Sequence, residues 1–198
     1  MKAMLMSIQS TPAYNIVTLK KELELRLKVP DLEKLGLKGI WVYLYVTQAK
    51  PYLIRNNNFG WQYKDKYSYY VSKKTLFFEN VLNSKIVARF WFDEYDFIEF
   101  APLYGYYSDI DDYRYAVGDN GLKDLCLSYN LLSNYGKGKD LYALHIKNLE
   151  IFETPKELNE FYRILSKREK SMLWENDLPM WKKVSKAPQS YQYVEVEE

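Results

Sequence analysis

Apolar and charged residues alternate along residues 19–28, which read LKKELELRLK. A repeat of two residues is that of a β-strand with one buried face and one polar face. One face of this predicted strand carries Leu23, Leu25 and Leu27. The opposite face carries charges of both signs, at Lys20, Glu22, Glu24, Arg26 and Lys28. Such a row is either a solvated strand face, since charged residues are mostly exposed, or the floor of a polar cleft.

Apolar, β-branched and aromatic patterns predict further strands, at 3–8, 40–47, 85–100, 141–152 and 191–196. Residues 40–47 are apolar or aromatic almost throughout, which indicates a strand buried on both faces. Asp93-Glu94 interrupts the pattern of 85–100, so we expect two strands there or one bent strand.

Helix signals occur near the start of the chain and past its middle. Thr11 suits an N-cap and Pro12 the first helical turn, which predicts a short helix that ends near Thr18. Residues 124–135 have a helical pattern, and Gly136 is placed to end that helix.

A third helix is predicted to begin at Thr154-Pro155, which carries the same start signals. Leu158, Phe161 and Leu165 form an apolar stripe at helical spacing. We therefore expect this helix to reach about Lys170.

The length of 198 residues fits a single domain that covers the whole chain. Residues 52–84 carry mixed signals and predict an insertion that is partly helical. Helical elaborations are expected at 101–136 and 155–186. Strands separated by helices, with a strand near each end, favour an α+β fold around a small β-barrel.

Composition excludes several classes of site. A single cysteine, Cys126, rules out an intramolecular disulfide, and a single histidine, His145, argues against a dedicated zinc site. No apolar run approaches the length of a membrane span, and no signal-peptide pattern is present. We expect a soluble cytoplasmic protein with no membrane partner, no metal and no cofactor.

Charge is distributed unevenly although the formal net charge is only +2. Residues 20–85 hold 13 Lys or Arg and 6 Asp or Glu, whereas residues 93–124 hold 2 and 9. If these segments lie on different surfaces, one face is basic and suits phosphates.

Lys21, Glu24 and Arg26 follow the first predicted helix at the spacing K-x-x-E-x-R. This arrangement resembles the signature G-x-K-x-x-E-x-R of the ASCH family of PUA-like β-barrels. Leu19 stands where the signature has Gly, a residue that would allow a positive φ between helix and strand. The resemblance implies a PUA-like mixed β-barrel of five to seven strands with surrounding helices.

Three further segments are similar to this family, in the same order along the chain. Residues 45–51 resemble the strand and turn that follow the signature. Residues 127–146 resemble a helix, turn and strand of uncharacterised bacterial and phage members, and residues 187–191 resemble their C-terminal turn. Together with the signature at residues 19–26, these segments comprise 40 of the 198 residues.

The resemblance implies a ligand site beside the signature strand. Lys21 and Arg26 supply donors for a phosphate or a base edge, and Glu24 can orient Arg26 or accept from a base amino group. We add Lys50 to the candidate ligand-binding residues. It lies near the end of residues 45–51, which resemble the family. The C-terminal turn adds residues that can read a base edge or stack on a base, namely Gln189, Ser190 and Tyr191.

Strand geometry sets a condition on this site. Glu24 and Arg26 share a strand face, but Lys21 has the opposite parity. The three converge only if the strand begins after Lys21 or bulges. Structural ion pairing of these charges is the alternative interpretation, and a plain strand-entry turn is the alternative for residues 189–191.

Three functions are open, and the sequence does not decide whether the chain is an enzyme. The first is binding of RNA or a nucleotide inside the cell. The second is a metal-independent ribonuclease or nucleoside amidohydrolase, with Lys21 and Glu24 as candidate catalytic residues. Against the amidohydrolase, Glu24 stands where those relatives have Thr, and Arg89 where the family often has an acidic residue. The third is a phage-associated module that binds a protein partner through the tyrosine-rich insertion.

Two basic segments have alternative interpretations. Gly136-Lys137-Gly138-Lys139 fits a phosphate-binding backbone nest or a helix end followed by a tight turn. Residues 167–170, with Lys182, Lys183 and Lys186, fit an auxiliary basic face or ordinary solvated charge.

Overall fold

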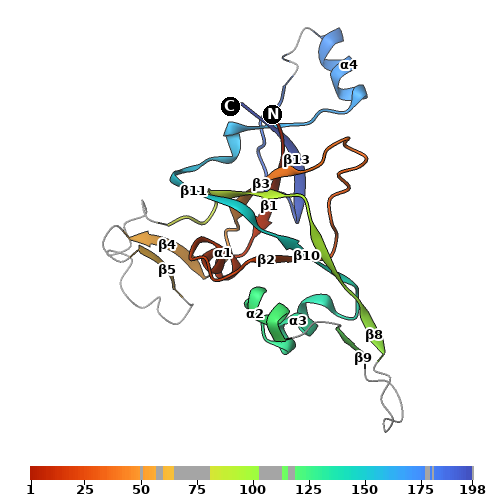
Figure 1. The fold of residues 1–198 in the computed structure, drawn as a ribbon. Helices are drawn as coiled ribbons and strands as arrows, with labels where there is room; N and C mark the ends of the chain where they lie inside the picture. The colour runs from red at the N-terminus through yellow and green to blue at the C-terminus, as the bar shows by residue number, and fades with distance from the viewer. Residues whose placement is uncertain are drawn as a thin grey trace.

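The computed structural model describes residues 1–49, 51–56, 60–64, 81–102, 113–115, 119–176, 179 and 181–197. At its centre is a six-stranded sheet with the strand order β11-β6-β3-β1-β13-β12 (Figure 1). Along the chain these strands are β1 (Lys2–Ile8), β3 (Ile40–Val46), β6 (Ile86–Phe92), β11 (Lys147–Lys156), β12 (Phe161–Arg163) and β13 (Tyr191–Val196). β1 and β3 are parallel, and the other neighbours are antiparallel.

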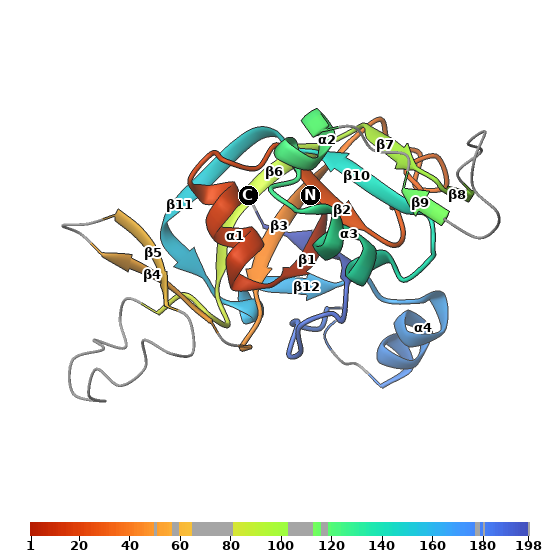
Figure 2. The same ribbon diagram turned by 90° about the horizontal axis from the view of Figure 1, so that it is seen from below.

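Both faces of the central sheet are covered, which explains its nearly continuous apolar strands. Helix α1 (Ser10–Val17) packs on one face through Ala13 and Ile16, against the core that includes Met4 and Met6 (Figure 2). On the opposite face, Val184 packs with side chains of the sheet that include Leu5 of β1 and Phe161 of β12.

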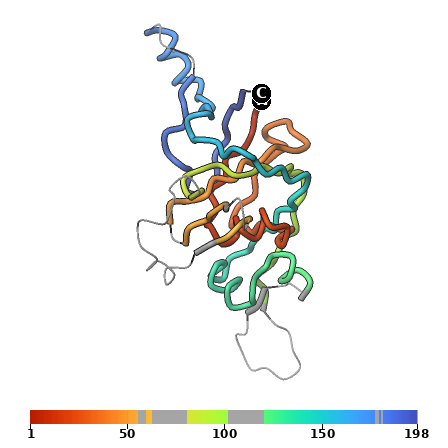
Figure 3. Tube along the Cα trace, turned by 90° about the vertical axis from the view of Figure 1, so that its left-hand side faces the viewer, coloured from red at the N-terminus to blue at the C-terminus, as the bar shows by residue number. Residues whose placement is uncertain are grey.

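The two ends of the described chain lie next to each other (Figures 1 and 3). β1 pairs with β13 in a register that sets Lys2 opposite Glu195 and Met6 opposite Tyr191. The predicted strand at 191–196 is therefore confirmed, and it lies between β1 and β12.

A three-stranded antiparallel sheet lies beside the central one, in the order β2-β10-β7. Its strands are β2 (Leu23–Arg26), β10 (Leu141–His145) and β7 (Tyr95–Ile98). Helices α2 (Asp119–Asp124) and α3 (Tyr129–Gly136) lie next to β2 and β10 (Figure 2). Their Leu125 and Leu132 regions complete a separate core with Leu23 and Leu25.

The two sheets meet at a corner where consecutive strands pass from one sheet to the other. Asp93 and Glu94 separate β6 from β7, as predicted, and His145 N donates to Glu94 O at 3.1 Å. Lys147 Nζ lies 2.8 Å from carboxylate oxygens of both Asp93 and Glu94. The α+β class is confirmed. In the part of the chain that the structure describes, β11 and β12 are the edges of the central sheet, and closure into a barrel is not shown.

Two hairpins extend from this body. β4 (Tyr52–Asn56) pairs with β5 (Gly60–Lys64), and β8 (Phe100–Pro102) pairs with β9 (Tyr113–Tyr115). The expected insertion at 52–84 thus begins with strands. Residues 57–59 and 65–80 lie outside the described residues, as does most of the aromatic surface expected there.

Asn83 fixes the base of the first hairpin. Its Oδ1 accepts from Leu53 N at 2.9 Å, and its Nδ2 lies 3.0 Å from Thr47 O and 2.9 Å from Ala49 O. One side-chain amide therefore joins the end of β3 to the start of β4, where backbone groups lack a strand partner.

The helix predicted from Thr154-Pro155 to about Lys170 is wrong. β11 continues to Lys156, a 3₁₀ turn covers Leu158–Glu160, and β12 follows. Phe161 pairs with Val196 in the sheet, and its ring contacts Tyr43 with centroids 5.0 Å apart. Leu158, Phe161 and Leu165 do pack inward, but from a 3₁₀ turn, a strand and the segment after it rather than from one helix. α4 (Lys167–Glu175) begins later, at an N-cap on Ser166 closed by a capping box with Glu169.

The helix predicted at 124–135 is divided. α2 ends at Asp124, and α3 begins after Ser128, whose side chain accepts from Leu131 N. Gly136 is the last residue of α3, and Lys137 takes the left-handed position with φ of +50°. None of the described helices is long and apolar enough to cross a membrane.

Candidate functional site

The turn between α1 and β2 sets the position of the signature residues. α1 ends at Val17, and Leu19 then takes a left-handed conformation with φ of +58°. Lys20 N and Lys21 N both donate to Asn15 O, at 2.9 and 3.1 Å. Leu19 thus supplies the positive φ that Gly would adopt without strain, while its side chain is 74% exposed.

Lys21, Glu24 and Arg26 converge. β2 begins only at Leu23, so Lys21 precedes the strand and its opposite parity does not separate it from the other two. Lys21 Nζ lies 2.8 Å from Glu24 Oε2, and Arg26 Nη2 lies 2.8 Å from Glu24 Oε1. We call these three residues the β2 charge cluster.

The β2 charge cluster is buried. The exposed fractions are 6% for Lys21, 4% for Glu24 and 8% for Arg26, whereas Glu22 and Lys28 are exposed. A solvated strand face is therefore the wrong interpretation for Glu24 and Arg26. Charges are rarely buried unless they are paired or bind a ligand.

Glu24 is held as a carboxylate. Burial alone raises its pKa, but the charges of Lys21 and Arg26 act in the opposite direction, and the pKa is lowered overall. With two cations around one carboxylate, the cluster carries a net charge of +1. The second cation is therefore not balanced within the cluster.

Hydrogen bonding within the β2 charge cluster is incomplete. Arg26 Nε, Arg26 Nη2 and Glu24 Oε2 are buried without a hydrogen-bond partner among the described residues. Glu24 Oε2 and Arg26 Nη2 nevertheless lie 2.8 Å from oppositely charged partners, so Arg26 Nε is the atom of the three without a close partner among the described residues. Because a buried unsatisfied donor costs free energy, Arg26 Nε is the donor of the cluster that most lacks an acceptor.

Helices α2 and α3 bring two further groups to this region. Tyr135 Oη donates to Leu25 O at 3.3 Å, and Cys126 Sγ lies 2.8 Å from Lys20 O. Burial raises the pKa of Tyr135, with Arg26 acting to lower it and Glu24 to raise it. The Tyr135 phenol is therefore a neutral donor within electrostatic range of the cluster.

The turn at 188–190 is tied to the end of β1. Ser7 N donates to Ser190 O at 2.9 Å, and Ser7 Oγ donates to Pro188 O at 2.6 Å. Tyr191 Oη donates to Val29 O at 3.4 Å, three residues beyond Arg26. Gln189 and Ser190 are exposed, and among the described residues no hydrogen bond or ion pair joins either side chain to the β2 charge cluster. Lys50 lies outside the described residues.

No protein-family model matches the chain, and neither does any curated protein. Two solved structures are similar over 98% of the chain. The ASCH crystal structure from Zymomonas mobilis has 12% identity and a TM-score of 0.44, with 87% of that chain covered. A mutant of the same Zymomonas mobilis protein has 13% identity and a TM-score of 0.43, with 88% covered. Both are ASCH structures, the family that the sequence resembles, and no residue role is carried over at this level of similarity.

Sequence reasoning did not find Tyr135. It was placed on the predicted helix only as part of a pattern, and its partner Leu25 is 110 residues away in the chain. One weak signal in the sequence points to Tyr135. Residues 127–146, which contain it, resemble the same family as the signature strand. That similarity indicates that the two segments occur together, without showing that they touch.

Proposed function

We propose that this protein binds RNA or a nucleotide, and that Arg26 of the β2 charge cluster contacts a phosphate or a base edge. The observation that carries the proposal is the buried guanidinium of Arg26, whose Nε lacks a hydrogen-bond partner among the described residues. An anion there would supply an acceptor for Nε and balance the net positive charge of the cluster.

Each member of the β2 charge cluster then has a defined role. Glu24 holds the guanidinium from one side, through the contact between Oε1 and Nη2. Lys21 holds the other oxygen of Glu24, which fixes the carboxylate between two cations. An arginine held in this way loses little conformational entropy on binding, and its planar edge matches a phosphate or the Hoogsteen edge of guanine.

Gln189, Ser190 and Tyr191 are proposed to border the bound nucleotide. The hydrogen bond from Tyr191 to Val29 supports this, because it brings the turn to the segment that directly follows β2. Lys50 is proposed as an additional cation for the phosphate backbone.

The test is a titration with a short fluorescent single-stranded RNA at several salt concentrations. Arg26→Lys keeps the charge but removes the bidentate edge, so we expect weaker binding while the folded state persists. Arg55→Lys is the matched control, because Arg55 donates to the carbonyls of Phe152 and Glu153 on another part of the fold. No binding by the unchanged protein at low salt would remove the proposal, as would equal binding by both variants.

A second candidate is cleavage of RNA without a metal, at the same cluster. The observation that favours it is Tyr135, a protonated phenol within electrostatic range of Arg26 and Glu24, since such donors can stabilise charge that develops on a phosphoryl group. Labelled RNA incubated with EDTA should yield product that decreases in Tyr135→Phe and Lys21→Arg. Absence of product from the unchanged protein would exclude this activity.

We also infer a PUA-like arrangement of the two sheets. The passage of β6 into β7, and of β10 into β11, at one corner supports it. An experimental structure that includes the segments beyond the described residues would test whether the sheets close into a barrel.

A further inference from the structure

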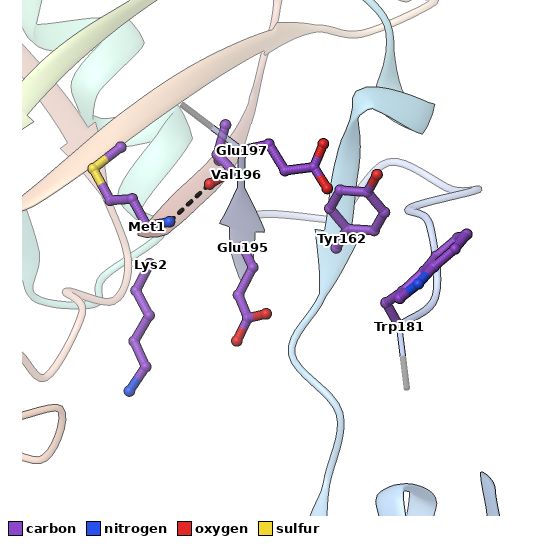
Figure 4. A pocket seen from close by; sticks show the side chains of 7 residues that line it. All are labelled: Met1, Lys2, Tyr162, Trp181, Glu195, Val196 and Glu197. Atoms are coloured by element: carbon purple, nitrogen blue, oxygen red, sulfur yellow. Dashed lines mark hydrogen bonds between the residues drawn. The ribbon is translucent and has the colours of Figure 1, made fainter. Parts of the chain in front are cut away.

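A polar and aromatic hollow lies at the opposite end of β1 from Ser7. Its lining includes Lys2, Tyr162, Trp181, Glu195 and Glu197 (Figure 4). β1 runs for seven residues, which places this hollow about 20 Å from the turn at 188–190. None of the residues that line it belongs to the β2 charge cluster.

Strand register explains why these side chains gather. Lys2 pairs with Glu195 across β1 and β13, and Glu195 pairs with Tyr162 across β13 and β12. Residues directly opposite on neighbouring strands share a sheet face. A cation, a carboxylate and a phenol thus stand in one row across three strands, as Figure 4 shows.

Trp181 continues this row beyond Tyr162. The two rings lie edge to face, with centroids 5.5 Å apart and planes at 79°. Tyr162 also forms an isolated bridge with Lys183, and Arg163 N donates to Lys182 O at 2.7 Å. These backbone contacts hold the two residues that follow Trp181, and the ring of Trp181 itself contacts Tyr162 although 54% of its surface is exposed. An exposed tryptophan held in place is suited to stacking on a flat ligand.

The charges around this hollow indicate what kind of flat ligand fits. Residues 167–186 hold six Lys or Arg and three Asp or Glu, so the chain beside Trp181 is basic. Lys182, Lys183 and Lys186 are all exposed. Within the hollow, by contrast, Glu195 and Glu197 would repel a phosphate. A ligand with an anionic backbone and a neutral aromatic group matches both parts.

We propose that this hollow binds one nucleobase of a single-stranded nucleic acid, with the base stacked on Trp181 and the flanking phosphates near Lys182 and Lys183. Glu195 accepts from an exocyclic amino group, and Lys2 donates to a ring nitrogen or carbonyl of the same base. The hollow therefore favours bases with an amino group over uracil. The inference shares with the proposed function only the class of ligand, because it uses none of the β2 charge cluster.

The experiment compares labelled hexacytidylate with hexauridylate, which differ at the exocyclic group of the base. The unchanged protein should bind hexacytidylate more tightly. Trp181→Ala should weaken that binding roughly 5-fold or more, since stacking contributes about 1–3 kcal/mol per base. Trp174→Ala is the matched control, because Trp174 is 79% exposed on α4 and does not line the hollow.

Glu195→Ala tests the reading of the base edge. It should reduce the preference for cytosine over uracil while leaving the affinity for hexauridylate nearly unchanged. Glu175→Ala, an exposed carboxylate on α4, should keep the preference. Circular dichroism and thermal melting of each variant establish that the fold is retained.

The outcomes separate the two sites. Arg26→Lys should weaken binding of both hexanucleotides by the same factor and leave the cytosine preference intact. Equal affinity of the unchanged protein for the two hexanucleotides, or equal effects of Trp181→Ala and Trp174→Ala, would overturn the base-binding hollow alone. Loss of the Arg26 effect with the cytosine preference kept would overturn only the role of the β2 charge cluster.

Discussion

Glu24 Oε1 lies 2.8 Å from Nη2 of Arg26, two residues further along the same four-residue strand. Both side chains are buried, and Lys21 approaches the other oxygen of the same carboxylate. Among the described residues, Glu24 is therefore the one negative charge that forms an ion pair with these two buried cations. Loss of that charge should affect folding more than loss of any exposed carboxylate nearby.

Glu24→Gln should lower the free energy of unfolding by about 3–5 kcal/mol, because it leaves two buried cations without a counter-charge. Urea denaturation followed by circular dichroism measures the change. Glu22→Gln is the control, since Glu22 is exposed and its side chain should contribute within about 0.5 kcal/mol. Similar midpoints for the two variants would contradict the prediction.

The lowered pKa of Glu24 predicts a specific dependence on pH. Because the carboxyl has its ordinary pKa near 4.5 when unfolded and a lower one when folded, its contribution to stability is fully present above that ordinary value. It is lost as the pH falls through the lowered folded pKa. The difference in unfolding free energy between the unchanged protein and Glu24→Gln should therefore be constant from pH 7 to about 5 and shrink below.

Denaturation curves at several pH values check this. Asp31, Glu94 and Glu169 also have lowered pKa values through exposed partners, but they are present in both proteins and cancel in the difference. A difference that stays the same down to pH 3 would show that Glu24 is not the group responsible.

Leu19→Gly should stabilise the fold by about 0.5–1 kcal/mol. A left-handed conformation costs a non-glycine residue about 1–2 kcal/mol, which glycine avoids. Part of this benefit is offset because glycine also increases the backbone entropy of the unfolded chain. Little burial is lost, since the Leu19 side chain is exposed. Leu27→Gly is the control, because Leu27 is also exposed but has no positive φ, and it should destabilise.

Asn83→Asp should destabilise by about 1–3 kcal/mol, because it replaces donors with an acceptor that faces the carbonyls of Thr47 and Ala49. Thermal melting gives the change. Hydrogen exchange should show faster exchange at Leu53 N, which bonds to Asn83. Asn176→Asp, on the exposed end of α4, should have a small effect. Equal melting temperatures for the two variants would argue against the role of Asn83.

The strands were predictable wherever the pattern of apolar and polar residues follows directly from which side chains are buried. β13 has the predicted bounds, and the break at Asp93-Glu94 occurs because those charges lie at the corner between two sheets. The structure after Thr154 was not predictable in the same way. Leu158, Phe161 and Leu165 have a spacing that fits the helix we predicted, but it also fits an irregular extended chain. The choice depends on pairing with β13, which the local sequence does not contain.

The charged residues of the candidate site were identified from the sequence, but not their convergence. Whether Lys21 meets Glu24 depends on where β2 begins. That point is set by hydrogen bonds from Glu22 N to Asp124 O and from Ile146 N to Glu22 O, which join residues more than a hundred positions apart. Tyr135 and the hollow at Trp181 were missed for the same reason, because strand register and helix packing assemble them.

The position of β13 inside the central sheet has a consequence for biosynthesis. β1 is synthesised long before β13, and one of its two edges stays without its partner until residues 191–196 have been made. Exposed strand edges promote association between chains. Until then the nascent polypeptide presents an unpaired strand edge that chaperones would need to shield, and a chain truncated before residue 191 should yield aggregates rather than a partly active product.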